Sequence, residues 1–152
     1  MGKTEPLTQV TVTYRQARAM LPLVRSIVSD AKDLERQLQQ RRHDLSRVRS
    51  GGPKKAGRLY DDELAESRND LEADERQLDA YRNELTQLGL RWVSSDEGEV
   101  EFPTTFANRT MYLCWKLGDD DLVYWRQPEQ SFDLRERIPD QALATLSSAA
   151  RF

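Results

Sequence analysis

The chain has 152 residues, the length of one ordinary domain or of one domain with an appendage. Charged residues make up 32% of it and hydrophobic residues only 38%, which favours long solvated helices over a thick globule. The formal net charge of −3 gives no overall attraction to nucleic acid or to an anionic membrane. No apolar run approaches the roughly 20 residues that span a bilayer, and one cysteine permits no internal disulfide. We therefore expect a cytoplasmic protein without a membrane segment.

A first long helix is expected to begin near Thr13 and to end at residues 50–53, where two glycines and a proline interrupt helical structure. Thr13 and Gln16 have the spacing of a capping box, in which each side chain bonds the amide of the other residue. Pro22 lies inside this helix and predicts a kink, because its ring displaces the carbonyl four residues earlier. An almost wholly apolar seam follows in steps of three and four: Ala17, Met20, Val24, Ile27, Ala31, Leu34, Leu38, Arg41, Leu45 and Val48.

A second helix is expected to end at Gly89, which suits the left-handed position after a helix. Its seam consists of Leu64, Ser67, Leu71, Asp74, Leu78, Tyr81, Leu85 and Leu88. Because the connection between the helices is short, they should fold back as a coiled-coil-like antiparallel hairpin over residues 13–89. Apolar residues are densest near the start of the first helix and the end of the second, and a hairpin places these two regions side by side.

The two helices carry opposite charges. Residues 32–58 contain nine basic and three acidic residues, whereas residues 61–101 contain fourteen acidic and four basic ones. One interpretation is internal complementarity that sets the register of the hairpin, with each exposed pair contributing about 0.5 kcal/mol. The other is that the hairpin tip binds phosphate groups, which would make nucleic acid a partner. The basic residues of the tip are Arg47, Arg49, Lys54, Lys55 and Arg58.

Residues 90–138 change to short alternating segments rich in aromatic and β-branched residues. The expected strands are residues 90–93, 99–102, 110–117 and 122–126. They predict a three- or four-stranded antiparallel meander that packs on the apolar end of the hairpin, with residues 10–13 at one edge. Alternation in the third strand places Met111, Leu113 and Trp115 on one face. Residues 139–152 predict a short helix or a tail, and the whole chain is expected to be one α+β unit.

Four short stretches of the sequence form a recognisable set: Leu21-Pro22, Glu101-Phe102-Pro103, the run from Tyr112 to Gly118, and Tyr124-Trp125. Together they resemble the bacterial family known as domain of unknown function 2203. The similarity extends from about Val12 to Ile138 and implies no established activity. A histidine commonly follows the Tyr-Trp pair in that family, and Gly-Phe and Gly-Arg steps come after it. This chain has Arg126, Ser131-Phe132 and Leu134-Arg135 at these places, so it looks like a divergent member to which imidazole chemistry does not transfer.

No catalytic or metal site is expected from the sequence. A cysteine nucleophile needs a neighbouring base, but the single histidine, His43, falls on the outer face of the first helix, far from Cys114 in its strand. Cys114 is therefore expected to be a small buried core residue. The run Asp119–Asp121 lacks the alternating ligands of a calcium loop and predicts a turn. We expect a protein that is not an enzyme and needs no cofactor.

The aromatic residues and arginines near the sheet have two interpretations. One is a pocket for a small carboxylate or phosphate ligand, with arginines as anion contacts and tryptophans as walls. Its residues would be Arg109, Trp115, Trp125, Arg126 and Arg135. The other is a core over which the arginines extend to pair with acidic residues: Glu99, Glu101 or Asp133. Alternation in the last strand places Leu122 and Trp125 on opposite faces.

The predicted hairpin leaves one side of its apolar seam uncovered, because two helices alone do not enclose it. A second copy closes the seam most simply, in a four-helix bundle about a two-fold axis. The leucines expected on the open side are Leu34, Leu38, Leu45, Leu71 and Leu78. We therefore expect a non-enzymatic scaffold protein that forms a dimer and presents its sheet or its tip to an unidentified protein partner. The ligand-binding and nucleic-acid interpretations remain as alternatives.

Overall fold

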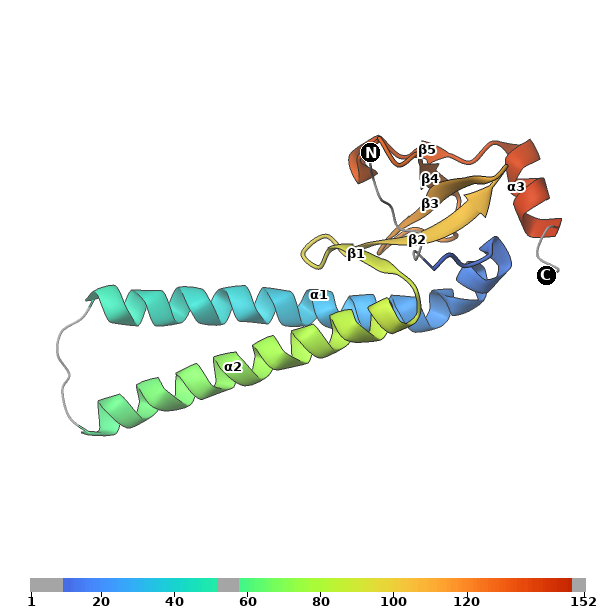
Figure 1. Ribbon diagram of the computed structural model, residues 1–152. Coiled ribbons are helices and arrows are strands. Elements are labelled where there is room, and N and C mark those ends of the chain that lie inside the picture. The colour runs from blue at the N-terminus through green and yellow to red at the C-terminus, as the bar shows by residue number, and fades with distance from the viewer. Residues whose placement is uncertain (1–9, 52–57, 149–152) are drawn as a thin grey trace, which may run out of the picture.

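A computed structural model describes residues 10–51 and 58–148, with side chains described outside residues 48–60, and it has the predicted α+β architecture. Helix α1 (Tyr14–Gly51) and helix α2 (Arg58–Gln87) form a long antiparallel hairpin (Figure 1). A small sheet lies against the N-terminal part of α1, and α2 leads into its first strand (Figure 1). The predicted C-terminal helix is present as α3 (Asp140–Ser148), which packs beside the start of α1.

The start of α1 confirms the capping box. The Thr13 amide donates to Gln16 Oε1 at 2.9 Å, and the Gln16 amide donates to Thr13 Oγ1 at 3.0 Å. Pro22 lies inside the helix, and the turns before it bend toward the sheet (Figure 1). The end of α2 is also as predicted, because Gly89 follows it with a positive φ of 95°.

The sheet has five antiparallel strands in the order β1-β2-β3-β4-β5. They are β1 (Arg91–Ser94), β2 (Glu99–Phe106), β3 (Arg109–Lys116), β4 (Tyr124–Arg126) and β5 (Glu136–Arg137), with a short 3₁₀ turn, η1 (Phe132–Leu134), before the last. The prediction of three or four strands omitted β5, because two residues carry no alternating pattern. Residues 10–13 form no strand, but the Val12 amide donates to the carbonyl of Pro103 at 2.8 Å.

Two turns depend on residues with positive φ. Ala107 and Asn108 connect β2 to β3 with φ of 52° and 62°, the signs that a tight two-residue hairpin turn requires. Gly98, at φ 70° before β2, lies so close to Leu117 and Val28 that an added Cβ would be 2.9 Å from the Leu117 Cβ. The turn after β1 therefore packs directly on α1.

The main core lies between one face of the sheet and the base of the hairpin. Met111, Leu113 and Trp115 point into it, which confirms the predicted face of β3. Leu122 and Trp125 also share this core, so their predicted placement on opposite faces was wrong. The reason is that β4 begins only at Tyr124, and strand alternation does not extend back to Leu122.

A second, smaller core lies farther along the hairpin. It is built from buried Ala31, Leu38 and Leu78, with Leu34 and Leu71 partly buried beside them. The expectation that Leu38 and Leu78 lie on the open side of the seam was therefore wrong, since the two helices enclose both. Within residues 10–51 and 58–148, no helix combines the length and apolar character needed to cross a membrane.

Candidate functional site

The strands of the sheet separate the five residues of the predicted pocket. Trp115 is fully buried and Trp125 nearly so, and both face the helices as part of the main core. Tyr112 and Arg126, which are register partners on β3 and β4, lie on the opposite face, because adjacent residues of a strand alternate. The tryptophans therefore do not form walls for an anion bound by Arg126.

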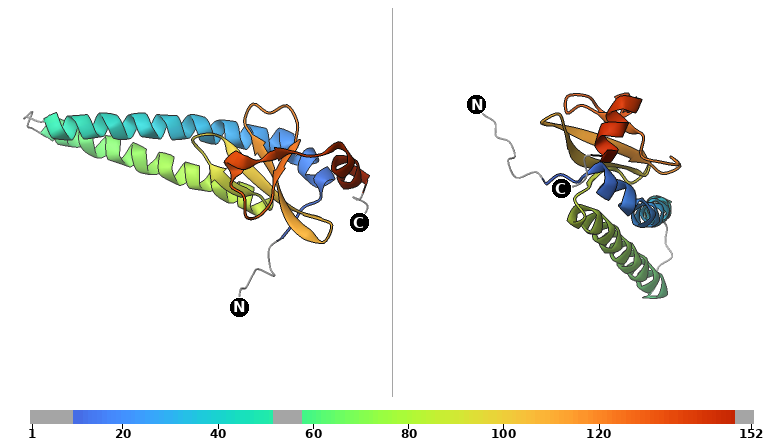
Figure 2. Two further views of the ribbon diagram at one scale, coloured as in Figure 1. Left: turned by 90° about the horizontal axis from the view of Figure 1, so that it is seen from above. Right: turned by 90° about the vertical axis from the view of Figure 1, so that its right-hand side faces the viewer.

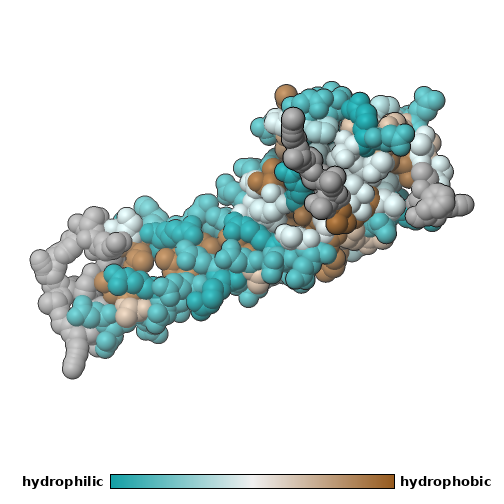
Figure 3. All heavy atoms as spheres, viewed as in Figure 1, coloured by the Kyte–Doolittle hydropathy of each residue, from teal (hydrophilic) through white to brown (hydrophobic). Residues whose placement is uncertain are grey.

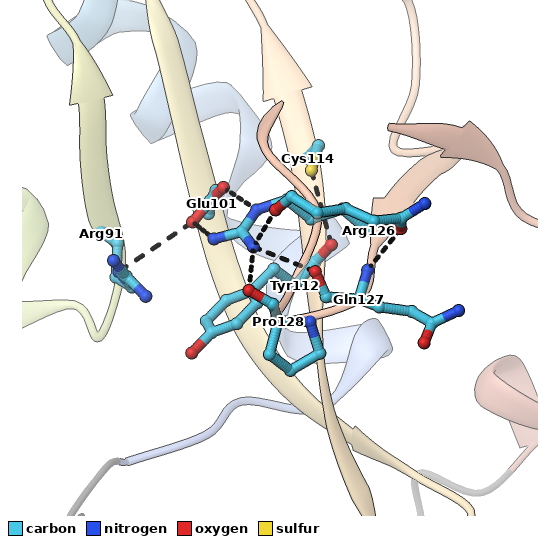
Figure 4. Close-up of polar contacts among 8 residues, drawn as sticks. Arg91, Glu101, Tyr112, Cys114, Arg126, Gln127 and Pro128 are labelled. Atoms are coloured by element: carbon cyan, nitrogen blue, oxygen red, sulfur yellow. Dashed lines mark hydrogen bonds and ion pairs between the residues drawn. The ribbon is translucent and has the colours of Figure 1, made fainter. Parts of the chain in front are cut away.

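Arg126 forms a buried ion pair with Glu101 on the outer face of the sheet. The exposed fractions are 2% for Glu101 and 8% for Arg126. Nη2 donates to Glu101 Oε1 at 2.9 Å, and Nε donates to Oε2 (Figure 4). Hydrogen bonding to Glu101 raises the pKa of Arg126 and outweighs the lowering by burial. This pair agrees with the second interpretation of the sequence, in which the arginines near the sheet pair with acidic residues such as Glu101 and do not bind a ligand.

The third nitrogen of the Arg126 guanidinium, Nη1, holds the segment that follows this residue. Nη1 donates to the carbonyls of Gln127, Pro128 and Gln130 at 3.0, 3.2 and 2.7 Å (Figure 4). The guanidinium also lies 4.4 Å from the centre of the Tyr112 ring, on which Arg91 stacks as well, at 5.0 Å. The same arginine therefore anchors the 127–130 loop to the sheet. The sequence did not predict the stacking on Tyr112, although register pairing places Tyr112 opposite Arg126.

The other two arginines of the predicted pocket lie apart from one another. Arg109 is exposed at the start of β3 and donates to Gln127 Oε1 at 3.1 Å. Arg135 donates to Asp119 Oδ2 at 3.0 Å and stacks on Tyr124, with its guanidinium 4.3 Å from the ring centre. Both arginines support loops around the sheet, and only Arg109 meets the segment that Arg126 holds.

Cys114 lies between these polar groups but has no accessible surface. Burial raises the pKa of its thiol to about 12, and the Glu101 carboxylate contributes in the same direction. Its Sγ lies 3.5 Å from the carbonyl of Tyr112. His43 is exposed on the distal part of α1 and is no partner for it. In the part of the chain that the structure describes, no group of three or more histidine, cysteine and acidic residues is placed to hold a metal.

The hairpin offers a different kind of surface. Arginines on α1 pair with acids on α2, with Arg41 3.1 Å from Asp74 and Arg42 2.9 Å from Glu75. These pairs support internal complementarity as the explanation of the opposite helix charges. Apolar side chains reach the surface between the charged residues of α1 and those of α2, where the two helices meet (Figure 3). Four leucines of the distal hairpin are only partly buried: Leu34, Leu45, Leu64 and Leu71.

The predicted basic tip falls largely outside the described residues. Arg47 is described and exposed. The side chains of Arg49, Lys54, Lys55 and Arg58 lie outside the described part of the chain.

Comparisons with known proteins connect these features to one family. The model of the family described as "Uncharacterized conserved protein (DUF2203)" matches residues 11–138. Comparisons with curated proteins and with solved structures found no match. The matched region includes the hairpin and all five strands and ends before α3.

Proposed function

The chain belongs to the uncharacterised DUF2203 family, as the motifs of its sequence predicted, and from its geometry we propose that it is a non-enzymatic interaction protein that self-associates through the hairpin. The observation that carries this proposal is the apolar seam of the distal hairpin, which stays partly exposed (Figure 3). The two alternatives have less support. The tryptophans of the proposed anion pocket lie in the core, and Arg47 is the one basic tip side chain among the described residues.

The seam changes character along the hairpin. At its base the sheet supplies a third layer, and Val24, Val28 and Leu85 have no accessible surface. Beyond Trp92, whose ring touches the smaller core, the two helices have no third layer among the described residues. Leu45 and Leu71 are only partly buried there. A pair of helices buries one stripe of each helix and leaves the flanks of that stripe in contact with water, and bundles of four helices cover such flanks.

The charges of the helices favour a second copy as the partner. Over residues 61–87, α2 has ten acidic and three basic residues, whereas α1 is basic toward its distal end. A two-fold bundle is able to place α1 of each copy beside α2 of its own chain and beside α2 of the other chain, and we propose this arrangement. Each neighbouring pair of helices then has opposite charges. The acidic residues of α2 repel an acidic partner, and the basic residues of α1 repel a basic partner.

The mass of the protein in solution, measured by light scattering, tests this proposal. The wild-type chain should have twice the mass of 17.6 kDa at high micromolar concentration. The double variant Leu45→Asn, Leu71→Asn should shift toward the monomer, because it places polar groups on the seam without altering the main core. The control double variant Leu23→Asn, Leu134→Asn changes leucines that are 50% and 63% exposed outside the seam, and it should keep the dimer mass.

Circular dichroism separates loss of assembly from loss of the hairpin. The seam variant should retain its helical signal while its mass falls. A wild-type protein that stays monomeric at high micromolar concentration with full helicity would contradict the proposal. An equal loss of mass in the two double variants would show that the seam is not the interface.

A further inference from the structure

A groove of about 450 Å³ lies between the first turns of α1 and the turn that joins β3 to β4. The connection between these strands passes beside the N-terminal part of α1 (Figure 2). Two contacts fix it there: the Tyr14 hydroxyl donates to the carbonyl of Leu122 at 2.7 Å, and Arg18 pairs with Asp121. The volume lies within the range of ligand sites in proteins, and the groove is open to solvent along its length.

Three arginines of α1 line this groove on one face of the helix, at Arg15, Arg18 and Arg25. Arg18 is held in place, because its Nε and Nη2 donate to the two carboxylate oxygens of Asp121, each at 3.0 Å. The guanidinium of Arg25 lies 5.6 Å from the centre of the Trp115 ring. Among the described residues, neither Arg15 nor Arg25 has an acidic partner. These two side chains therefore present unpaired positive charge at the two ends of the groove.

The groove also offers acceptors and an apolar floor. Ala19, Leu21 and Pro22 lie between the arginines. Pro22 has no amide hydrogen, so the carbonyl of Arg18 receives no hydrogen bond from the residue four positions later. Asp120 adds an exposed carboxylate on the opposite wall. A ligand that fits all of these groups has two separated negative charges, an apolar part between them and N–H donors.

We propose that this groove binds an acidic peptide segment of a partner protein in extended conformation, with two carboxylates that contact Arg15 and Arg25 and an apolar side chain that rests on Pro22. The spacing is suitable. Ten residues of a straight helix span about 15 Å along the axis, which is the upper limit for the axial separation of the two arginines across the bend at Pro22. In an extended peptide, side chains four residues apart lie about 13 Å apart, a difference that long arginine side chains cover. Backbone amides of such a peptide would supply the N–H donors.

Nucleic acid fits the groove less well than an acidic peptide. A nucleic acid strand carries a phosphate at every nucleotide, and the wall formed by Asp120 and Asp121 would lie against that row of charges. The carboxylate of Asp121 is already bound to Arg18 on both oxygens, which leaves the negative charge of Asp120 uncompensated. A peptide has few charges, and it is able to place a neutral or basic residue at this wall.

Fluorescence anisotropy with a labelled peptide tests the proposal on the full-length protein. The probe is the fluorescein-labelled peptide Glu-Ala-Leu-Ala-Glu in low-salt buffer, where exposed charges are screened least. It should bind the wild type, and its counterpart with both glutamates replaced by glutamine should not. The double variant Arg15→Gln, Arg25→Gln should weaken binding about tenfold, as expected for two exposed charge contacts.

Two control proteins make each outcome decisive. Arg36→Gln removes an exposed arginine of α1 outside the groove and should leave binding unchanged. Arg25→Lys keeps the charge above Trp115 and should retain most of the binding, which guards against a folding defect. The proposal is overturned if the wild type does not bind the acidic peptide, if the glutamine peptide binds equally, or if Arg36→Gln has the same effect as the double variant. Binding of labelled oligothymidylate that the groove variant abolishes would reassign the site to nucleic acid.

Discussion

Arg126 acts as a structural anchor because each of its three guanidinium nitrogens donates to another group of the chain. It pairs with buried Glu101 and holds three carbonyls of the following loop. The sequence predicted an arginine in contact with an acid or with a ligand, but it did not decide between them. That decision depended on the register of the sheet, in which Glu101 lies opposite Cys114 and Tyr112 lies opposite Arg126. Register is a tertiary property that alternation within one strand does not provide.

Replacement of Arg126 by methionine should strongly destabilise the protein. The substitution leaves the carboxylate of Glu101 buried without a partner, which typically costs about 3–5 kcal/mol. Urea unfolding measures the change in the free energy of unfolding. Arg109→Met, which removes an exposed arginine near the same loop, is the control and should have a small effect. Equal losses in the two variants would show that the buried pair does not anchor the fold.

Cys114 should be almost inert toward thiol reagents in the folded protein. With a pKa of about 12 in place of about 9, the thiol has roughly a thousandfold less thiolate at pH 8, and burial also blocks access. Ellman's reagent measures the reaction, which should become fast only in denaturant. Asn83→Cys adds an exposed thiol on α2 as the control, and it should react at once. Fast reaction of the wild type under native conditions would contradict the burial of this strand.

At the scale of elements, local signals predicted the helix ends well. The capping box at Thr13 and the left-handed Gly89 are determined by residues within a few positions of each other, so the sequence was sufficient for them. Strand β5 was missed because its two residues are held by pairing with β4 and have no pattern of their own. The arginine-lined groove was missed for a similar reason. Arg18 and Asp121 are 103 positions apart, and only the packed sheet brings them together.

The ion pair between Arg18 and Asp121 should make stability depend on pH in the acid range. Burial raises the pKa of Asp121, but hydrogen bonds from Arg18 and from the Leu122 amide outweigh it and lower the pKa overall. A lowered pKa contributes stability that is present above the unfolded value of about 3.9 and is lost as pH falls through the folded value. Asp121→Asn should therefore reduce the free energy of unfolding near neutral pH by about 0.5 kcal/mol, since the pair is exposed and screened.

The difference between wild type and Asp121→Asn should shrink as the pH falls below the unfolded value of about 3.9 and through the lowered folded pKa of Asp121, because protonation of the carboxylate removes the ion pair. Chemical denaturation at a series of pH values measures it. Asp33→Asn removes a carboxylate from an exposed arginine pair within α1 and serves as the control. Because that pair joins no two elements, its removal should change stability less. A difference that persisted unchanged at low pH would rule out the ion pair as the origin of the effect.

At the scale of the whole molecule, the hairpin extends far beyond the base formed with the sheet (Figure 1). The main core is enclosed, whereas the distal seam holds only a small core with Leu38 and Leu78 at its centre. Heptad spacing predicted the hairpin, but it assigned too many leucines to the open side of the seam. The spacing alone did not show which leucines face the other helix of the same chain. The leucines that remain partly exposed, with the opposite charges of the helices, are the basis of the proposed assembly.

Pulsed electron–electron double resonance between spin labels most directly tests the central claim, which is that two copies associate through the hairpin. His43 is exposed on the distal part of α1, and His43→Cys provides one reactive thiol because Cys114 is buried. Each chain then carries a single nitroxide, so any defined distance must arise between two copies. We predict a distinct dipolar modulation at high micromolar concentration, which Leu45→Asn with Leu71→Asn removes. A featureless background decay in the wild type with full helicity would contradict assembly through the hairpin.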